Sequence, residues 1–337
     1  MNRGFSVIGA REIKGIIENK EVFIQELIKQ TYLMHYQNLT INPNSCFLRY
    51  PDKPKSRIIA LPAHLGNDIN ISGVKWIASF PQNSSKNLPR ASAILILNDG
   101  ETGFPFACLE SSLISATRTA ASAVLAAEHI RKNNKTGINL GIIGSGLLAQ
   151  NVYKFLEGNK WDISEVRVFD LNKVSINKFI NNAEHKQQVK IKACQDVDEV
   201  ICNSNMIVLS TTTLEPYIHE FSLFRHNPIV LNISLRDLAP EILINSNNVV
   251  DDVEHVMNAA TSPHLTKQKF GHTKFINGTI AGLIEKKYVL DETKPTIFSP
   301  MGMGVLDLAL GKYIYDQAIS KDFVINIPNF FDGIVND

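Results

Sequence analysis

The stretch that ends at Asp170 constrains the fold of this chain more than any other part of it. It opens with an apolar run at residues 138–143, and a glycine-rich turn, Gly-Ser-Gly-Leu-Leu-Ala, follows at residues 144–149. A helix-like segment then continues to Gly158, and a second apolar run at residues 166–169 leads to the acid. This order of strand, glycine turn, helix, strand and acid predicts a β-α-β unit of a parallel sheet.

Each part of this stretch suits a bound dinucleotide. Gly144 allows a tight turn, and Gly146 has no side chain to obstruct a pyrophosphate. The N–H groups at the expected helix start, near Leu147 and Leu148, favour a phosphate. Asp170 follows at the distance where an acid accepts hydrogen bonds from the adenine ribose and disfavours a 2′-phosphate. The stretch therefore predicts an NAD site with NAD preferred over NADP, and its context favours this over an ordinary tight turn.

The alternation of strands and helices continues after this unit. Further strand candidates lie at residues 189–193, 206–210, 229–233, 249–250 and 297–298. Alternation of this kind is typical of a doubly wound α/β domain with a parallel sheet. A Ser-Pro-Met-Gly-Met-Gly run at residues 299–304 then precedes a helix that we expect at residues 305–319 and that we expect to return to the N-terminal domain.

The N-terminal part of the chain has a different pattern. Residues 21–38 have the apolar spacing of an amphipathic helix, and residues 111–131 predict one or two helices. The β-like runs between them, separated by turn residues, lie at residues 45–49, 57–61, 73–79, 91–98 and 104–109. Strands this closely spaced, without helices between them, predict an antiparallel or mixed sheet rather than a second parallel one.

Composition limits the classes of partner. The chain has 337 residues, enough for two domains, and a net charge of +1, which indicates no nucleic-acid partner. No apolar run approaches the length of a membrane span, and residues 1–20 lack the apolar core of a signal peptide. The four cysteines lack CxxC spacing and the histidines lack metal-ligand spacing. We therefore expect a cytoplasmic protein with neither a membrane partner nor a metal.

Four cations of the N-terminal part are candidates for binding an anion. Lys75 interrupts an apolar run, where a cation is costly to bury unless an anion pairs with it. Arg118 lies among small residues that leave room for a ligand, and an arginine can hold a carboxylate with two hydrogen bonds. Both patterns favour anion binding. For Arg90 the sequence favours a surface cation that reaches solvent or an acid. For Arg49 it favours neither that interpretation nor anion binding over the other.

Polar residues follow two of the expected strands in the α/β part. Asp237 comes after a strand, at the sheet edge where ligands and catalytic groups gather in open α/β sheets. It is either a general acid or base with a raised pKa or the N-cap of the next helix. Ser210, Thr211 and Thr212 also follow a strand, and they either line the cofactor crevice or form a hydroxyl-rich turn.

These features stand in the order found in the ornithine cyclodeaminase and mu-crystallin family, which the chain resembles along nearly its full length. The resemblance looks closest to the 2,3-diaminopropionate biosynthesis dehydrogenases of siderophore pathways. The segments that carry it are residues 57–62, 72–77, 94–99, 112–121 and 299–303. Together these segments are far more specific than a dinucleotide fingerprint alone.

The resemblance implies a fold and an assembly. It implies a Rossmann domain, residues 126–299, inserted in an α+β substrate and dimerisation domain built from residues 1–125 and 300–337. It also implies a homodimer formed through the substrate-domain sheets. The run of strands between residues 45 and 109 supports that expectation, because a sheet that helices do not cover on both faces commonly pairs with a second copy.

The resemblance also implies roles for individual residues. Lys75, Arg118 and Asp237 would be the catalytic residues, with Asp237 near the reacting carbon and nitrogen. The residues implied in substrate binding are Arg49, Lys75, Arg118, Met301 and Gly302. The residues implied in NAD binding are Thr119, Gly144, Gly146, Leu147, Leu148, Asp170, Ser210, Thr211 and Thr212.

The activity that the resemblance implies is NAD-dependent oxidative cleavage of N-(2-amino-2-carboxyethyl)-L-glutamate to L-2,3-diaminopropionate and 2-oxoglutarate. The family's cyclodeaminases carry a Glu where this chain has Ile59, and a Gly-Gly-Asp run where it has Leu235-Arg236-Asp237. These departures argue against ornithine cyclisation. The alternatives are an ornithine cyclodeaminase or cyclic-imine reductase, and a binding protein that, like mu-crystallin, keeps the cofactor site without turnover.

Overall fold

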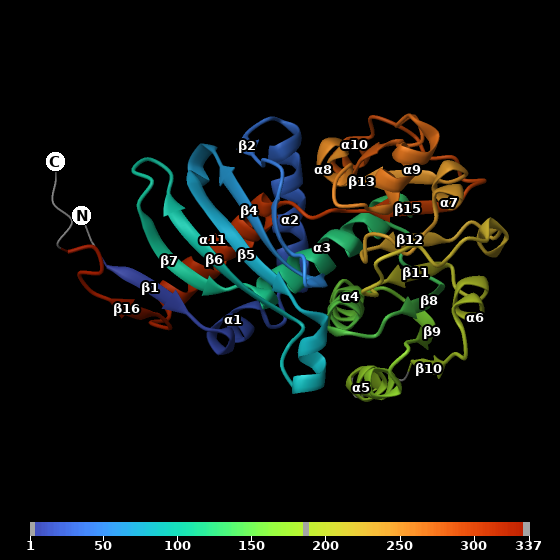
Figure 1. Ribbon diagram of the computed structural model, residues 1–337, viewed down its shortest axis with the longest axis horizontal. Helices are drawn as coiled ribbons and strands as arrows, with labels where there is room; N and C mark the ends of the chain where they lie inside the picture. Colours follow the sequence, from blue (N-terminus) through green and yellow to red (C-terminus); the bar gives the residue numbers. More distant parts are fainter. Residues whose placement is uncertain (1–3, 185–188, 333–337) are drawn as a thin grey trace. The chain divides into compact units, whose positions relative to one another are not determined.

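The computed structural model describes residues 4–184 and 189–332. The chain forms two compact units (Figure 1). Unit 1 consists of Met1–Arg118 and Met303–Asp337, and unit 2 consists of Thr119–Gly302. The units therefore divide at 118/119 and 302/303, where the sequence suggested 125/126 and 299/300. The predicted fold class is confirmed, since an α/β unit with a parallel sheet is inserted in a unit built from both chain ends.

Unit 1 contains a mixed sheet, as predicted. Among the described residues it has eight strands, in the order β16-β1-β7-β6-β5-β4-β2 with β3 on β4. The strands are β1 (Phe5–Ile8), β2 (Thr40–Ile41), β3 (Cys46–Tyr50), β4 (Lys53–Leu65), β5 (Ile71–Ser79), β6 (Ala91–Asp99), β7 (Pro105–Glu110) and β16 (Ile325–Ile327). β1 and β7 are parallel, and the other neighbours are antiparallel. The sequence analysis predicted neither β1 nor the two edge strands β2 and β16.

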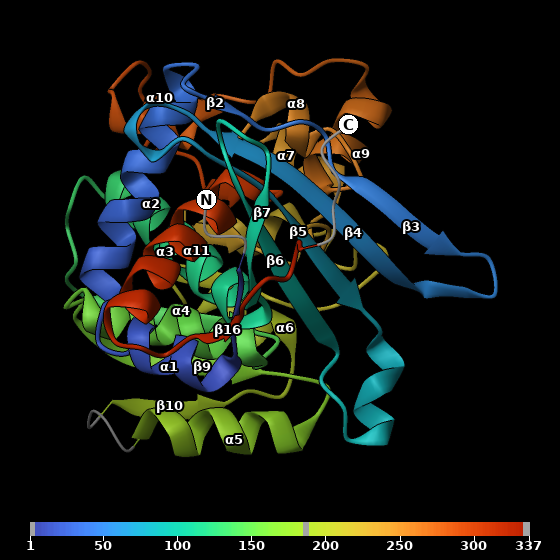
Figure 2. The same ribbon diagram turned by 90° about the vertical axis from the view of Figure 1, so that its left-hand side faces the viewer.

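Helices cover one face of this sheet. They are α1 (Ala10–Ile17), α2 (Glu21–Tyr36), α11 (Gly304–Ser320) and the first turns of α3 (Ser112–Ile130). α11 contacts β4 to β7 and also α1 and α2, and Figure 2 shows it lying along the sheet. Gly304 permits this approach, because a Cβ there would lie 2.9 Å from the backbone oxygen of Leu61. The prediction that the C-terminal helix returns to the first domain is confirmed. Two short 3-10 turns, η1 (Asn67–Ile69) and η2 (Pro81–Lys86), follow β4 and β5.

Unit 2 contains a parallel sheet in the order β10-β9-β8-β11-β12-β15-β13-β14. The strands are β8 (Ile138–Ile143), β9 (Ile163–Phe169), β10 (Lys190–Ala193), β11 (Met206–Leu209), β12 (Ile229–Asn232), β13 (Asn247–Val250), β14 (Gly278–Thr279) and β15 (Thr296–Ser299). The chain runs from β8 to β9 on one side and later returns to β11 on the other. The strand order therefore reverses beside β8, where dinucleotide sites form in such sheets.

Unit 2 contains the part of α3 that follows Arg118, the two twelve-residue helices α4 and α5, and several shorter helices. They are α4 (Leu147–Gly158), α5 (Lys173–Glu184), α6 (Val197–Cys202), α7 (Pro240–Ile244), α8 (Val253–Val256), α9 (Ser262–Phe270) and α10 (Ile280–Ile284), with the 3-10 turn η3 (Phe221–Phe224). Among the helices that the structure describes in either unit, none is both long enough and apolar enough to cross a membrane.

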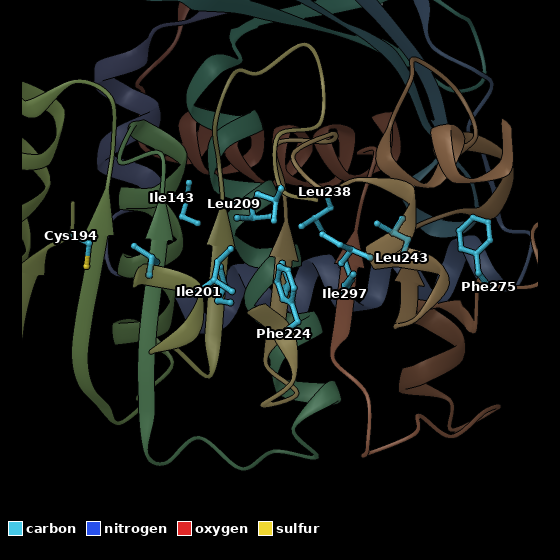
Figure 3. Packing of buried hydrophobic residues seen from close by; sticks show 14 residues of the cluster. Ile143, Cys194, Ile201, Leu209, Phe224, Leu238, Leu243, Phe275 and Ile297 are labelled. Carbon is cyan, nitrogen blue, oxygen red and sulfur yellow. The ribbon is translucent and has the colours of Figure 1, made fainter. Parts of the chain in front are cut away.

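One face of the parallel sheet packs on a continuous apolar cluster (Figure 3). Ile143, Leu209 and Ile297 contribute from β8, β11 and β15, and Phe224 and Leu243 contribute from η3 and α7. Residues of β11 and β12 are buried on both faces of the sheet, which explains their nearly continuous apolar sequence. Polar side chains are therefore confined to the ends of these strands, and the candidate site begins there.

Candidate functional site

The glycine-rich turn follows β8 directly. Gly144 has a φ of +86°, and a Cβ there would lie 2.8 Å from the backbone carbon and oxygen of Ser210. The Ser210 hydroxyl donates a hydrogen bond of 2.6 Å to the Gly144 carbonyl. This position therefore requires glycine twice over, for its conformation and for its contact with the end of β11. The structure brings these two predicted cofactor residues together.

The start of α4 has the properties of a phosphate site. Gly146 is the N-cap of α4 and makes no side-chain capping bond, and no described atom lies within 4 Å of the position its Cβ would take. Leu147 is exposed and Leu148 is half-buried. Open space in front of uncapped helix N–H groups, at the positive end of a three-turn helix, suits a pyrophosphate. The residues present therefore fit a dinucleotide.

Asp170 lies half-buried just after β9 and is tied to the same turn. One carboxylate oxygen accepts hydrogen bonds from the backbone N–H and the hydroxyl of Ser145, at 2.7 and 3.0 Å, and the other accepts one from the N–H of Asn172, at 2.8 Å. The sequence predicted a contact with ribose hydroxyls and not this support of the turn. A carboxylate oxygen accepts more than one hydrogen bond, so the two roles are compatible.

Asp237 and Thr211 meet beyond the ends of β12 and β11. The Thr211 hydroxyl donates to Oδ1 of Asp237 at 2.7 Å, and the Tyr217 hydroxyl donates to Oδ2 at 3.3 Å. The N-cap of α7 is Ala239, so the N-cap interpretation of Asp237 is wrong. The side chain is fully buried, and burial raises the pKa of this carboxyl, against the hydrogen bonds of Thr211, Ser234 and Tyr217. Thr212 is exposed beside it.

The backbone next to Asp237 is strained. Leu235 has a φ of +80°, which is unfavourable for any residue with a branched side chain. The turn is held in place because Ser262 donates its N–H to the Leu235 carbonyl at 2.7 Å, and Arg236 donates to the Ala259 carbonyl at 2.9 Å. Leu235 stands where the family's cyclodeaminases carry glycine. It thus keeps the positive φ that a glycine adopts without strain.

In unit 1, Lys75 and Arg118 share one acid. Lys75 Nζ lies 2.7 Å from one carboxylate oxygen of Asp307 and 3.1 Å from the Ser115 hydroxyl, and Arg118 Nε lies 3.2 Å from the other oxygen of Asp307. The Lys75 side chain is 2% exposed and that of Asp307 is 0% exposed. The anion that a buried Lys75 requires is therefore supplied from α11. Sequence reasoning missed Asp307, although an acid inside the apolar run at residues 305–310 was a visible signal.

This network has two cations and one carboxylate, so it has a net positive charge when Lys75 is protonated. Burial lowers the pKa of Lys75 to about 8, and the charge of Arg118 acts in the same direction, while Asp307 opposes both. A further negative charge near these cations would stabilise the protonated lysine. The network is therefore suited to an anionic ligand.

The remaining predicted site residues have separate surroundings. Arg49 is exposed on β3, with its guanidinium 5.0 Å from the Phe47 ring centroid, and Arg90 donates to the Ser79 hydroxyl at 2.8 Å. Met301 and Gly302 donate their N–H groups to the buried Asp251, at 3.1 and 2.6 Å. Thr119 lies half-buried in α3, and Gly302 has a φ of +92°. Within residues 4–184 and 189–332, no group of His, Cys, Asp and Glu side chains is placed to hold a metal ion.

The class of protein follows from comparison with known families. The model of the ornithine cyclodeaminase/mu-crystallin family matches residues 18–322. The chain belongs to this family, and the resemblance seen in the sequence is confirmed.

Individual relatives span the whole chain. N-((2S)-2-amino-2-carboxyethyl)-L-glutamate dehydrogenase of Staphylococcus aureus is 30% identical over 94% of this chain and 96% of its own length. Alanine dehydrogenase of Archaeoglobus fulgidus is 27% identical over 96% of this chain and 98% of its own length. Among solved structures, Thermococcus litoralis Delta(1)-pyrroline-2-carboxylate reductase in complex with NADH and L-proline has a TM-score of 0.87 at 23% identity, covering 96% of this chain and 100% of that one. An archaeal alanine dehydrogenase dimer with bound NAD has a TM-score of 0.86 at 24% identity, covering 97% and 100%.

Proposed function

We propose that the protein is an NAD-dependent oxidoreductase that cleaves N-(2-amino-2-carboxyethyl)-L-glutamate to L-2,3-diaminopropionate and 2-oxoglutarate. The observation that carries the proposal is the buried network of Lys75, Arg118 and Asp307, whose net positive charge suits a substrate with several carboxylates. The relative from Staphylococcus aureus supports this choice of substrate. The activity would serve siderophore biosynthesis or a related pathway in the cytoplasm.

Different residues of unit 2 bind different parts of NAD. Gly144, Gly146 and the N–H groups of Leu147 and Leu148 hold the pyrophosphate, and Asp170 accepts hydrogen bonds from the adenine ribose. Thr119, Ser210, Thr211 and Thr212 line the rest of the site. Bound NAD would supply the acceptor for the hydride that leaves the glutamyl α-carbon.

Asp237 handles the protons of the reaction. Oxidation of the substrate leaves a C=N bond, to which water adds, and the resulting carbinolamine breaks its C–N bond to release 2-oxoglutarate and the amine. Water must lose a proton and the leaving nitrogen must gain one. A buried carboxyl with a raised pKa exchanges protons near neutral pH more readily than an ordinary one, and Thr211 and Tyr217 orient its two oxygens.

Lys75 and Arg118 bind substrate carboxylates and stabilise negative charge as it develops. Asp307 keeps both side chains in fixed positions, which limits the entropy they lose when the substrate binds. Arg49, Met301 and Gly302 complete the proposed substrate contacts.

Substrate affinity is expected to be constant below pH 8 and to fall about tenfold per pH unit above it. The free protein has a Lys75 pKa of about 8, so its positive charge is present below that pH and is lost as the pH rises through it. Equilibrium binding of 2-oxoglutarate across a pH series measures this. The Lys75→Met variant should bind weakly at every pH and show no such fall, and an equal fall in the variant would refute the assignment.

NAD is expected to bind more tightly than NADP. The Asp170→Ala variant should bind NAD about tenfold more weakly, because hydrogen bonds worth roughly 0.5–1.5 kcal/mol each are lost with the carboxylate. NADP affinity should fall less, so the gap between the cofactors should narrow. Titration of protein fluorescence with each dinucleotide measures both affinities, and tighter binding of NADP to the unmodified protein would contradict the prediction.

Unit 1 also supports the homodimer. On the sheet face opposite to α11, Trp76 of β5 is paired in register with Ala60 of β4 and Ile94 of β6. Trp76 is 41% exposed, Ile94 is 42% exposed and Leu48 on the same face is 46% exposed. Large apolar side chains gathered on an open sheet face are typical of an interface between two copies. We propose that this face forms the dimer.

Trp76→Arg is expected to convert the protein to a monomer at micromolar concentration. Placing a charge on an apolar interface leaves it buried and unpaired in the dimer, and an aromatic residue near the centre of an interface often contributes 2 kcal/mol or more, so the dissociation constant should rise at least about thirtyfold. Light scattering measures the mass. Val289→Arg, at a site 84% exposed in unit 2, is the control and should leave the mass unchanged. A dimer of unchanged affinity in Trp76→Arg would show that the interface lies elsewhere.

The activity itself is tested by incubating the purified protein with NAD and each candidate amino acid. N-(2-amino-2-carboxyethyl)-L-glutamate should give NADH and 2-oxoglutarate in equal amounts, and mass spectrometry should identify 2,3-diaminopropionate. Ornithine should give neither ammonia nor proline. Proline from ornithine would indicate the cyclodeaminase activity, and oxidation of proline by NAD would indicate a cyclic-imine reductase. Either result would overturn the proposal.

A further inference from the structure

The turn that carries Asp237 is connected to two other loops of unit 2 through its neighbour Arg236. The guanidinium group of Arg236 donates a hydrogen bond to the Ala259 carbonyl at 2.9 Å and a longer one to the Leu214 carbonyl at 3.4 Å. Leu214 lies in the loop after β11, and Ala259 lies between α8 and α9. One half-buried side chain thus connects three segments that are distant in the sequence.

One of these segments supplies the groups that orient the Asp237 carboxylate. The loop after β11 contains Thr211, whose hydroxyl donates to Asp237 Oδ1 at 2.7 Å. The same loop continues through Leu214 to Tyr217, whose hydroxyl donates to Oδ2 at 3.3 Å. Arg236 therefore binds both the turn of Asp237 and the loop that fixes the direction of its side chain.

The backbone on both sides of this connection is strained. Leu235 has a φ of +80°, and Ala259 and Ala260 have φ values of +57° and +54°. A residue with a Cβ is disfavoured in this region and persists there only where the surrounding structure holds it. Arg236 directly follows Leu235 and binds the Ala259 carbonyl, so its hydrogen bond joins the two strained segments.

The two residues before Asp237 differ together from those of the family's cyclodeaminases. Those proteins carry two glycines where this chain has Leu235 and Arg236. A glycine adopts a φ near +80° without strain, so a glycine turn needs little support from other loops. Leucine at the first position introduces strain, and arginine at the second position supplies hydrogen bonds that oppose it. The two replacements therefore compensate each other.

We propose that Arg236 is a positioning residue, which keeps Asp237 in place against Thr211 and Tyr217 by binding the loops that contain Leu214 and Ala259. The inference rests on the proposed function, in which Asp237 exchanges the protons of the reaction. Arg236 acts through Asp237 and is assigned no contact with the substrate.

The charge of Arg236 has a separate effect on the same carboxyl. Burial raises the pKa of Asp237, and the hydrogen bonds of Thr211, Ser234 and Tyr217 and the charge of Arg236 lower it. A variant that loses the hydrogen bonds of Arg236 but keeps its charge thus differs from one that loses both. This difference gives a readout that a purely structural role would not produce.

The first test compares two changes at position 236. Arg236→Met should lower kcat about ten- to a hundredfold, because displacement of a catalytic group is costly, while KM changes less than threefold. The acid limb of its kcat profile should move to higher pH by up to about one unit, since a charge that favours ionised Asp237 is lost. Arg236→Lys keeps the charge but cannot span two carbonyl groups. It should restore the profile and only part of kcat.

Two further variants separate positioning from general damage. Arg131 also donates to two backbone carbonyls, those of Asn134 at 2.8 Å and Thr136 at 3.0 Å, in another part of unit 2. Arg131→Met is therefore the matched control and should leave kcat and its pH profile unchanged. Leu235→Gly combined with Arg236→Met removes the strain together with its support, so kcat should be at least about fivefold above that of Arg236→Met. A double variant no more active than Arg236→Met would overturn the proposal.

Hydrogen exchange reports on the turn without turnover. The N–H groups of Tyr217 and Ile218 donate to the Asp237 carbonyl, at 3.2 and 3.1 Å, and the N–H of Ser262 donates to the Leu235 carbonyl at 2.7 Å. In the presence of NAD, these three amides should exchange about tenfold faster in Arg236→Met than in the unmodified protein. The rate in Arg131→Met should equal that of the unmodified protein.

The two measurements distinguish this inference from the proposed reaction. Faster exchange in Arg236→Met, in a protein that oxidises none of the candidate amino acids, would refute the reaction and keep the link between the loops. Exchange that Arg236→Met leaves unchanged, or a kcat that Arg131→Met lowers equally, would overturn the inference and keep the reaction. Thermal melting shows whether Arg236→Met is folded. If it is not, Arg236→Lys decides, and a kcat equal to that of the unmodified protein would refute the positioning role.

Discussion

Replacing Asp307 by asparagine is expected to destabilise the folded protein by about 3–5 kcal/mol. The change removes the carboxylate charge that Lys75 and Arg118 share, and the two buried cations repel each other in a poorly screened interior. Asp307 raises the pKa of Lys75, which is about 8 in the parent protein, so the lysine of the variant loses its proton at a lower pH. The loss of stability should therefore shrink as the pH rises towards 8 and stay constant above it, where Lys75 is neutral in both proteins. Substrate binding should also fail, since both cations lose their anchor.

The two tryptophans of the chain allow this loss to be assigned to one unit. Trp76 belongs to unit 1 and Trp161 to unit 2, so Trp161→Phe leaves a fluorophore that reports only on unit 1. Urea unfolding in that background measures the change. The double variant Lys75→Met, Asp307→Leu removes one charge of each sign and should be markedly more stable than Asp307→Asn alone. An Asp307→Asn midpoint equal to that of the parent would show that the network contributes little.

Asp237→Asn is expected to lower kcat by about 10²–10⁴-fold while the affinities for NAD and substrate stay within a few-fold. Asparagine preserves the shape of the side chain and can still accept the hydrogen bond from Thr211, but it cannot take up or release the proton that the water and the leaving amine exchange. Steady-state rates give kcat, and fluorescence titration gives the affinity for NAD.

Tyr217→Phe is the matched control for this position. It removes the hydrogen bond to Oδ2, which opposes the raised pKa of Asp237, so the acid limb of the kcat profile should move to higher pH while activity falls about tenfold or less. If Asp237→Asn were silent and the unmodified protein turned over no substrate, a binding protein similar to mu-crystallin would be the better description.

The parts of the fold that could be predicted depend on local sequence. The turn at Gly144 requires glycine for its own conformation, and the parallel strands are buried apolar runs, so both leave a readable pattern. The strand β1 and its edge neighbour β16 have only four and three residues, so their sequence carries little signal. The single helix α3, predicted as one or two, shows that an Ala- and Ser-rich pattern does not determine continuity.

The parts of the site that escaped prediction depend on contacts between distant residues. Asp307 is separated from Lys75 by 232 positions, and nothing near Lys75 in the sequence indicates which acid will meet it. Tyr217 reaches Asp237 across 20 positions through a loop. The pairing of Arg49 in β3 with Arg57 in β4 depends on the register of a hairpin. In each case the residue type was visible, and its partner was determined only by packing.

Because the cation network needs α11, unit 1 can complete its folding only after unit 2 has been synthesised. Every residue of unit 2 leaves the ribosome before Gly304–Ser320 does, so the dinucleotide-binding part can fold during translation, whereas Lys75 and Arg118 wait for their acid until the chain is almost complete. Until α11 is synthesised, Lys75 and Arg118 lack the carboxylate of Asp307, so both side chains must stay in contact with water. A nascent chain interrupted before residue 307 would therefore contain the glycine-rich turn of unit 2 and both cations of unit 1, but not the carboxylate that Lys75 and Arg118 share.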